Sequence, residues 1–238
     1  MDICHRLRLL DRPLSHFLIL GLMGLSVLSN GISAQSDPPR AVDFGVVGVD
    51  FKVYHTFTYK NSTPIPVVIK PKNVPCECST VRIADSLVMP GNSTSVRLEY
   101  DTKNVFGPTA KLFTVSTTDP ANPTLEYQYL SNVGQWLLGI RPEPPSAFFL
   151  PAHHSKRITI ANPRANKLQI AVKDQADSYY DVKILKGDVA KGGFAELEVV
   201  PSPTLSKGTY HSSFRLRVTP SEGTSPFYLS IPVKIVRY

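Results

Sequence analysis

Apolar and polar residues alternate along most of the chain after position 40, with the period of two that strands burying one face display. In segment 51–59 this alternation gives one face of the predicted strand five residues: Phe51, Val53, His55, Phe57 and Tyr59. Segments 96–100 and 214–218 alternate in the same way. No stretch of ten or more residues in this part of the chain carries a helical stripe. The pattern therefore predicts an all-β protein built from antiparallel strands.

Turn-forming residues separate these strands. The 21 prolines and 14 glycines lie mostly between the alternating runs, where they terminate strands and permit tight turns. Short strands with a turn about every 8–12 residues are typical of immunoglobulin-like β-sandwiches. Four prolines, at positions 64, 66, 71 and 75, remove ladder donors, so we expect them on an edge strand or a bend.

The pattern occurs twice. Segments 41–138 and 147–238 carry the same landmarks in the same order, at an offset of about 100 residues, which indicates duplication of a whole domain and not a solenoid of small repeats. Between them, residues 139–146 contain the proline-rich run Arg141-Pro-Glu-Pro-Pro-Ser146. We predict two tandem immunoglobulin-like β-sandwich domains joined by this segment as a stiff linker.

The first 34 residues have the pattern of a secretory signal peptide. Arg6, Arg8 and Arg12 precede a short apolar stretch, and Ala34 supplies a cleavage point. The apolar stretch at 17–28 is shorter than the roughly 20 residues a membrane span requires. We expect an exported protein that is periplasmic, envelope-associated or extracellular. The alternative is an uncleaved anchor, and only then would the protein contact a membrane.

Charge argues against nucleic acid as a partner. The formal net charge of +7 is spread along the chain, whereas nucleic-acid binding favours a contiguous basic stripe beside stacking aromatics. Arg215 and Arg217 occupy alternate positions of a predicted strand, so we expect both on one solvent face.

Cys76 and Cys78 are the only cysteines that remain once Cys4 leaves with the signal peptide. Cysteines in an exported protein usually form a disulfide. In a flat strand, however, their Cβ atoms would lie about 6.5–7 Å apart, and a disulfide requires about 3.5–4.5 Å. Three interpretations remain open: a local disulfide at a sharp bend after Pro75, a redox or soft-metal site, and free or intermolecularly paired thiols.

Two thiolates do not complete a tetrahedral zinc site. The histidines that could complete it are His55, His153, His154 and His211. No metal-ligand spacing links them to the cysteines, so we predict no metal, with Cys76 and Cys78 as the weak alternative.

No enzyme signature is present: the sequence lacks nucleophile-elbow, zinc-protease, phosphate-loop and dinucleotide motifs. The carboxylates form no evident acid–base pair. We therefore predict no catalytic residues, cofactor or small-molecule substrate. Trp136 is expected to pack at the end of the first sandwich or in the joint between the two domains. Tyr179 and Tyr180 leave carbohydrate binding as a minor alternative.

The first repeat resembles a domain of unknown function common in exported bacterial proteins, an immunoglobulin-like module related to hydin-type and major-sperm-protein-type domains. The resemblance covers about 41–134. It rests on the start Val42-Asp-Phe-Gly-Val-Val-Gly48, the segment 57–69, the Cys76-Glu-Cys-Ser-Thr80 match to a Cys-Gly-Cys-Thr motif, the turn Pro90-Gly91 and the hairpin segment 107–115. Glu77 and Ser79 stand where that motif has glycine and threonine. The resemblance implies the fold and no settled activity.

Together these features favour a non-enzymatic, exported binding or scaffold protein of the cell envelope. Its sandwich edges and loops would recruit an unidentified envelope or extracellular protein by strand addition. The competing class is a thiol-redox or soft-metal protein that acts through Cys76 and Cys78.

Overall fold

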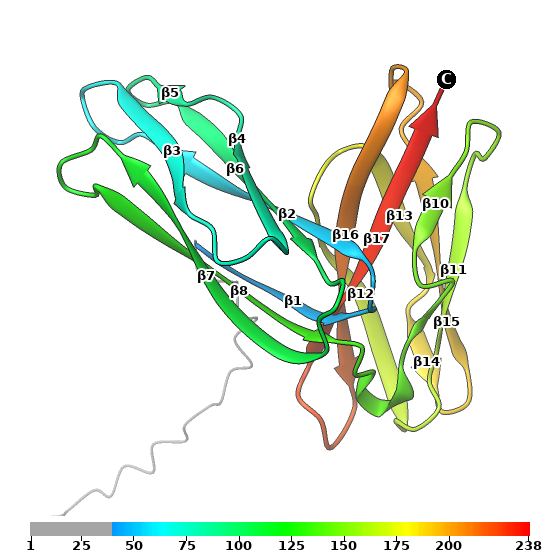
Figure 1. Cartoon of the computed structure of the whole chain (residues 1–238). Helices are drawn as coiled ribbons and strands as arrows, with labels where there is room; N and C mark the ends of the chain where they lie inside the picture. The colour runs from blue at the N-terminus through cyan, green and yellow to red at the C-terminus, as the bar shows by residue number, and fades with distance from the viewer. Residues whose placement is uncertain (1–39) are drawn as a thin grey trace, which may run out of the picture. The chain divides into compact units, whose positions relative to one another are not determined.

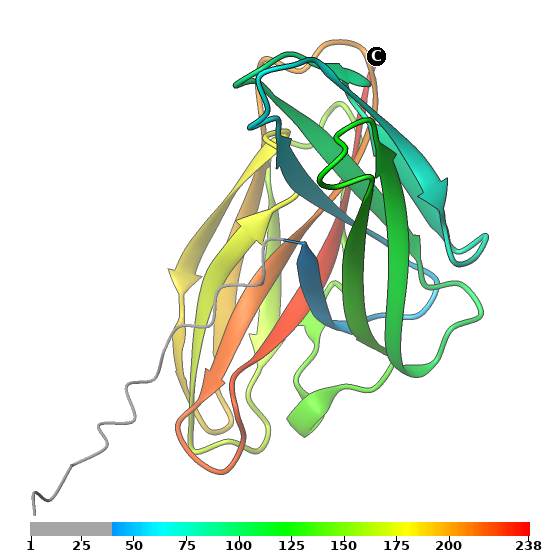
Figure 2. The ribbon, with the colours of Figure 1, turned by 90° about the vertical axis from the view of Figure 1, so that its left-hand side faces the viewer.

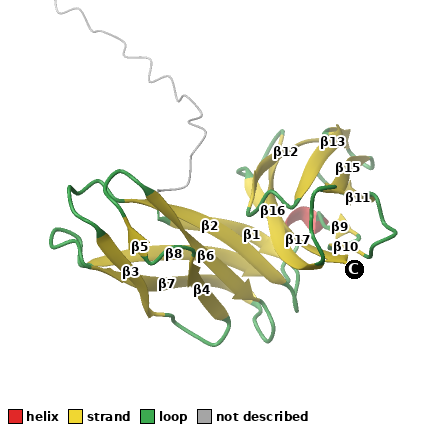
Figure 3. Ribbon diagram, turned by 90° about the horizontal axis from the view of Figure 1, so that it is seen from above, coloured by secondary structure: helices red, strands yellow, loops and turns green. Residues whose placement is uncertain are grey.

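The computed structural model describes residues 40–238. The predicted signal peptide at 1–34 lies outside these residues. Within residues 40–238 no helix is long and apolar enough to cross a lipid bilayer. The prediction of an all-β, immunoglobulin-like architecture is confirmed, because strands and their turns make up the fold, with one short 3-10 turn, η1 (Leu137–Gly139) (Figure 3).

The first sandwich comprises eight strands. They are β1 (Ala41–Val47), β2 (Lys52–Lys60), β3 (Val67–Asn73), β4 (Ser79–Ile83), β5 (Leu87–Val88), β6 (Ser93–Asp101), β7 (Gly107–Thr117) and β8 (Thr124–Val133). Strands β1-β8-β7-β3-β5 form one layer and β2-β6-β4 the other (Figure 1). Alternate residues of both layers bury a core rich in aromatic rings, in which the Phe113 and Tyr127 rings stack with centroids 4.9 Å apart.

Nine strands form the second sandwich. They are β9 (Pro142–Glu143), β10 (Ala147–Phe149), β11 (Lys156–Ala161), β12 (Lys167–Gln175), β13 (Tyr180–Lys186), β14 (Asp188–Ala190), β15 (Phe194–Pro201), β16 (Gly208–Pro220) and β17 (Phe227–Arg237). One layer has the order β14-β12-β16-β17, with β10 also paired to β17, and the other has the order β13-β15-β11-β9. Figure 2 shows the long antiparallel pair of β16 and β17 in orange and red.

A second apolar core fills this sandwich. Its members come mainly from β11 to β17, but Val46 of β1 also belongs to it. In the segment predicted as a linker, Pro142 and Glu143 form β9, which pairs with Ile160 and Thr159 of β11.

One sheet continues from one sandwich into the other. Strand β1 pairs in parallel with β8 on one side, and at Val46 it pairs in parallel with Leu229 of β17. The register of β1 shifts between Asp43 and Val46, where Gly45 has a φ of +64°. The joint between the repeats is therefore built partly from main chain that belongs to a shared sheet.

The prediction that Arg215 faces solvent is wrong. Its side chain is 2 % exposed, whereas that of Arg217 is half-buried. Arg215 forms an ion pair with Asp174 and donates a 2.6 Å hydrogen bond to the Asp43 carbonyl of β1. Burial against the other repeat, which alternation within one strand cannot show, removes this face of β16 from water.

Candidate functional site

The two cysteines lie in a tight turn immediately before β4. Cys76 and Cys78 are joined by a disulfide, with their Cα atoms 5.1 Å apart. The bend that brings them together includes a hydrogen bond from the Ser79 amide to the Cys76 carbonyl, at 3.1 Å. Both cysteines are only partly buried.

Lys111 of β7 lies over this disulfide. Its Nζ is 3.1 Å from the Cys76 sulfur and 3.0 Å from the Cys78 sulfur. Ser79 Oγ lies 3.4 Å from the Cys76 sulfur and forms a short hydrogen bond with the Tyr129 hydroxyl of β8. A single cation thus faces both sulfurs from a strand more than 30 residues further along the chain.

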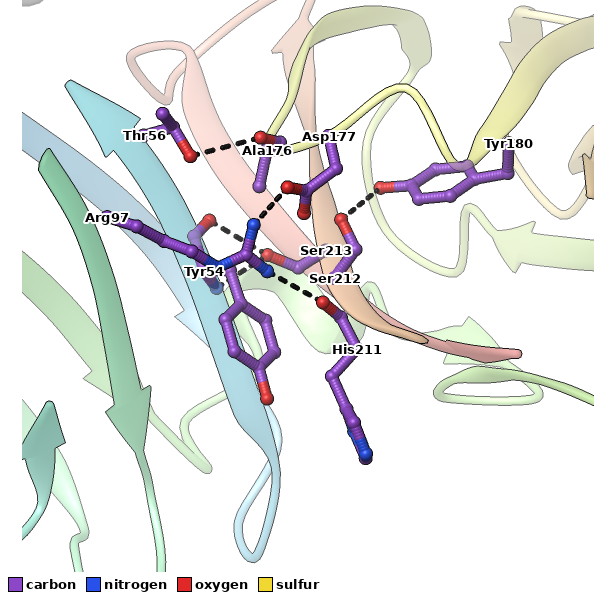
Figure 4. Close-up of polar contacts among 9 residues, drawn as sticks. All are labelled: Tyr54, Thr56, Arg97, Ala176, Asp177, Tyr180, His211, Ser212 and Ser213. Atoms are coloured by element: carbon purple, nitrogen blue, oxygen red, sulfur yellow. Dashed lines mark hydrogen bonds and ion pairs between the residues drawn. The ribbon is translucent and has the colours of Figure 1, made fainter. Parts of the chain in front are cut away.

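A second cluster of polar groups joins the two sandwiches. Arg97 of β6 forms an ion pair with Asp177, and its Nη2 donates a 2.7 Å hydrogen bond to the His211 carbonyl. The same guanidinium lies over the Tyr54 ring, 4.8 Å from its centroid. Figure 4 shows Arg97 reaching from the first sandwich to groups on the second.

Ser213 of β16 binds the edge of β2 directly. Its Oγ accepts a 2.7 Å hydrogen bond from the Tyr54 amide and donates a 3.0 Å bond to the Tyr54 carbonyl. Thr56 Oγ1 donates to the Ala176 carbonyl at 3.1 Å. These contacts cover part of the β2 edge, and Tyr54 is only 5 % exposed. Burial strongly raises the pKa of the Tyr54 phenol, so it remains protonated at neutral pH.

A cleft of about 540 Å³ opens beside these contacts, between the β2 end of the first sandwich and β10, β16 and β17 of the second. This volume falls within the range of about 300–1,000 Å³ usual for ligand sites. Its apolar lining comes from Phe51, Ala147, Phe148, Pro232 and Val233.

Charged groups of both signs surround this apolar lining: Lys52, Lys103, Lys234, Asp50 and Asp101. A neighbouring hollow of about 410 Å³ shares Lys52, Tyr54 and His211 with the cleft. Burial and the nearby Lys234 lower the pKa of the His211 imidazole, so this edge carries no added positive charge at neutral pH.

Phe148 is the apolar side chain of the cleft that protrudes most clearly. It is 39 % exposed, with Lys234 Nζ 5.5 Å from its ring centroid. Its strand, β10, pairs with β17 along one side, and no other described strand pairs with it. The cleft is thus lined by an exposed aromatic side chain on a short strand that pairs along one side.

Other residues considered in the sequence analysis contribute to the packing of the fold. Trp136 is half-buried and packs against the second core, beyond the last strand of the first sandwich. Tyr180 is 1 % exposed, with its hydroxyl 3.3 Å from Ser212 Oγ, so it is not the surface aromatic that the minor alternative of carbohydrate binding requires.

His153 bonds locally to Leu150 in an exposed loop. In the part of the chain that the structure describes, no group of three or more potential metal ligands comes together.

Sequence reasoning missed Lys111, Arg97 and Ser213. Lys111 and Arg97 are ordinary charged residues on the polar positions of amphipathic strands. Ser213 does not disturb the alternation of apolar and polar residues along its strand. Each acquires its role only through a partner 33 or more residues away. A weak signal was available for Lys111, since it shares its strand with the hairpin of the family resemblance.

The fold and these sites define a tandem immunoglobulin-like protein with a disulfide on one sandwich and a cleft beside the joint. Residues 38–128 match a family model described as "Protein of unknown function (DUF1573)". This match agrees with the unknown-function, immunoglobulin-like family that the first repeat resembles. No curated protein matches the chain.

The solved structures that this chain matches are distant from it. A protein of unknown function from Porphyromonas gingivalis W83 is 12 % identical, with 83 % of this chain and 97 % of that chain covered and a TM-score of 0.35. WR4, a Caenorhabditis elegans MSP family member, is 21 % identical over 42 % of this chain and 97 % of its own, with a TM-score of 0.32. The Pseudomonas aeruginosa CupB2 chaperone is 15 % identical over 79 % and 95 %, with a TM-score of 0.28.

Proposed function

We propose that the protein is a non-enzymatic, exported binding module that recruits another envelope or extracellular protein through the cleft beside the joint. The observation that carries this proposal is the cleft itself, with its apolar lining, mixed charged rim and protruding Phe148. Such a site suits an extended polypeptide, which offers apolar side chains, charges of both signs and a main chain for strand addition.

Two of the longer strand edges suit strand addition less well. Length does not decide among the short edges, because β10 and β14 have three residues each and β5 has two. β13 is longer, but its outward positions include Asp181, Lys183 and Lys186, and its register shifts between Ile184 and Lys186. Charges and bulges at an edge discourage pairing. On β3 the exposed Lys70-Pro71-Lys72 run has the same effect, so the cleft is the favoured contact surface.

Export is supported by chemistry as well as by the N-terminal pattern. The Cys76–Cys78 disulfide suits an oxidising compartment, because cytosolic reductants keep most thiols reduced. The proposed location is therefore the periplasm, the envelope or the exterior.

Photo-crosslinking in the source cells tests the proposal. A photoreactive phenylalanine analogue replaces Phe148 in one variant and Phe194, which is 53 % exposed on β15, in a matched control. We expect a discrete protein adduct at position 148 that is absent at 194. With the purified partner, Phe148→Ser should weaken binding at least about tenfold, as expected for an aromatic anchor, and Phe194→Ser should leave it unchanged. Identical adducts at both positions, or none at 148, would overturn the proposal.

A further inference from the structure

We propose that Cys76 and Cys78 form a thiol–disulfide exchange site in which the Lys111 ammonium holds the thiolate released from Cys78. This inference stands independently of the cleft, because it rests on the geometry of the first sandwich alone. A disulfide that is only a structural staple has no need of a cation 3.0 and 3.1 Å from its two sulfurs. A cation at that distance favours the reduced, anionic state over the neutral disulfide.

The charge of Lys111 is available for this role. Among residues 40–238, no carboxylate lies within ion-pair distance of Lys111 Nζ, while Lys52 and Lys167 do pair with carboxylates. Glu77, between the two cysteines, is exposed to solvent. When the disulfide is reduced and a thiol ionises, the thiolate therefore becomes the nearest charged partner of the Lys111 ammonium.

The other side chain within hydrogen-bond distance of the sulfurs, Ser79, is neutral. Ser79 Oγ touches both sulfurs and bonds to the Tyr129 hydroxyl of β8, whose ring lies 5.1 Å from that of Tyr100 on β6. Burial raises the pKa of the Tyr129 phenol, so it stays protonated in the range where thiols titrate. With Tyr129 as the donor to Ser79, the serine hydrogen can face the Cys76 sulfur. Lys111 is then the group whose charge decides the ionisation of the thiols.

The two cysteines differ in what they pack against. Both cysteines are partly exposed, but Cys78 packs against the apolar core of the first sandwich and Cys76 does not. An incoming thiolate therefore meets the Cys76 sulfur first. Reactive disulfides and thiols occupy partly exposed, electropositive surroundings of this kind, whereas buried structural ones are inert.

The exchange balances with a dithiol reductant. One thiolate of the reductant attacks the Cys76 sulfur, the Cys76–Cys78 bond breaks, and Cys78 leaves as a thiolate paired with Lys111. In the mixed disulfide, the first sulfur of the reductant is bonded to Cys76. The second thiolate of the reductant attacks that first sulfur and releases Cys76 as a thiolate. The reductant is oxidised to a disulfide, the protein gains two electrons, and the two protons of the dithiol pass to water or to the new thiols. Lys111 remains an ammonium throughout.

Alkylation of a single thiol measures the effect of Lys111 directly. In a Cys76→Ser background, the rate of Cys78 alkylation by iodoacetamide is followed from pH 5 to 10 by mass spectrometry. We expect Lys111→Gln to slow alkylation of Cys78 at pH 7 about tenfold. This loss corresponds to a rise of about one unit in the pH at which alkylation reaches half its maximal rate. Lys111→Arg should restore most of the rate. The matched control is Lys72→Gln, since Lys72 bonds to Thr124 and not to sulfur.

Equilibrium with dithiothreitol tests the intact pair. At pH 7, Lys111→Gln should shift the equilibrium about tenfold toward the disulfide, and Lys72→Gln should leave it unchanged. Equal alkylation profiles and equal equilibria in the parent and Lys111→Gln, with native circular dichroism in both, would overturn the proposal. Crosslinking at Phe148 in a Cys76→Ser/Cys78→Ser variant separates the two proposals, because loss of the thiols leaves the cleft intact.

Discussion

At the scale of single residues, Arg215 shows how a charge is accommodated inside this fold. Its guanidinium is almost fully buried, yet it forms an ion pair with Asp174, donates to the Asp43 carbonyl and lies 5.2 Å from the Tyr228 ring centroid. A buried cation is tolerated when its donors are satisfied and its charge is paired. Three separate strands or loops must therefore be in place before Arg215 can be buried.

Arg215 and Arg217 make a matched pair for testing this interpretation. We expect Arg215→Ala to lower the free energy of unfolding by about 2–4 kcal/mol, because it removes packing together with the ion pair to Asp174 and the hydrogen bond to the Asp43 carbonyl. Arg217→Ala, two residues along β16 and half-buried, should change it by less than about 0.5 kcal/mol. Urea unfolding followed by circular dichroism measures both, and equal effects would contradict the assignment.

At the scale of elements, the start of β1 explains the Asp-Phe-Gly motif. Asp43 Oδ1 accepts a 2.7 Å hydrogen bond from the Gly45 amide, and Phe44 packs in the first core with its ring stacked on Tyr100. Gly45 has a φ of +64°, and a Cβ placed on it would lie 2.1 Å from the Tyr228 carbonyl oxygen. The glycine is required because β1 approaches the main chain of β17 at this point.

A glycine in an open turn provides the control for this requirement. Gly45→Ala should lower the free energy of unfolding by about 3 kcal/mol or more, from the sum of backbone strain and the clash with β17. Gly91→Ala has a similar φ of +77° but nothing within 4 Å of its added carbon, so its cost should be only about 1 kcal/mol. A Gly45→Ala protein as stable as Gly91→Ala would show that β1 can move away from β17.

Strand β2 shows how far the alternating pattern predicts an element. Val53 and Phe57 are buried as the period of two requires, but Tyr54, on the opposite face, is buried as well. The second sandwich covers that face through Ser213, and Arg97 of the first sandwich lies over the Tyr54 ring. The sequence could predict the strand and its core face, because both follow from local periodicity, but not the second contact, which depends on a neighbour about 160 residues away.

At the scale of the whole molecule, the described part of the chain forms one compact unit. The sheet shared through β1 and β17, the Arg97–Asp177 ion pair and the Ser230 bond to the Phe44 carbonyl all cross from one repeat to the other. These contacts give the two cores a common stability, because the sandwiches cannot separate at this joint without exposing polar groups that are now paired.

We therefore expect one cooperative unfolding transition. Trp136 is the only tryptophan and packs against the second core, so its fluorescence reports on that sandwich, while far-ultraviolet circular dichroism reports on both. The two probes should give the same urea midpoint, as two-state unfolding requires. In Gly91→Ala, a first-sandwich variant, both midpoints should shift together. A fluorescence transition separate from that of circular dichroism would show that the sandwiches unfold independently.

The sequence by itself determined the all-β class, the repeated landmarks, the core faces of the main strands and the special positions of Cys76 and Cys78, because periodicity, turn chemistry and cysteine spacing act over a few residues. Only the tertiary structure decided that Lys111 faces the sulfurs, that Arg215 is buried, that Gly45 touches β17 and that a cleft forms beside the joint. These features arise where strands distant in the sequence are brought together, and the packing of two sandwiches fixes charges and hydrogen bonds that no local pattern specifies.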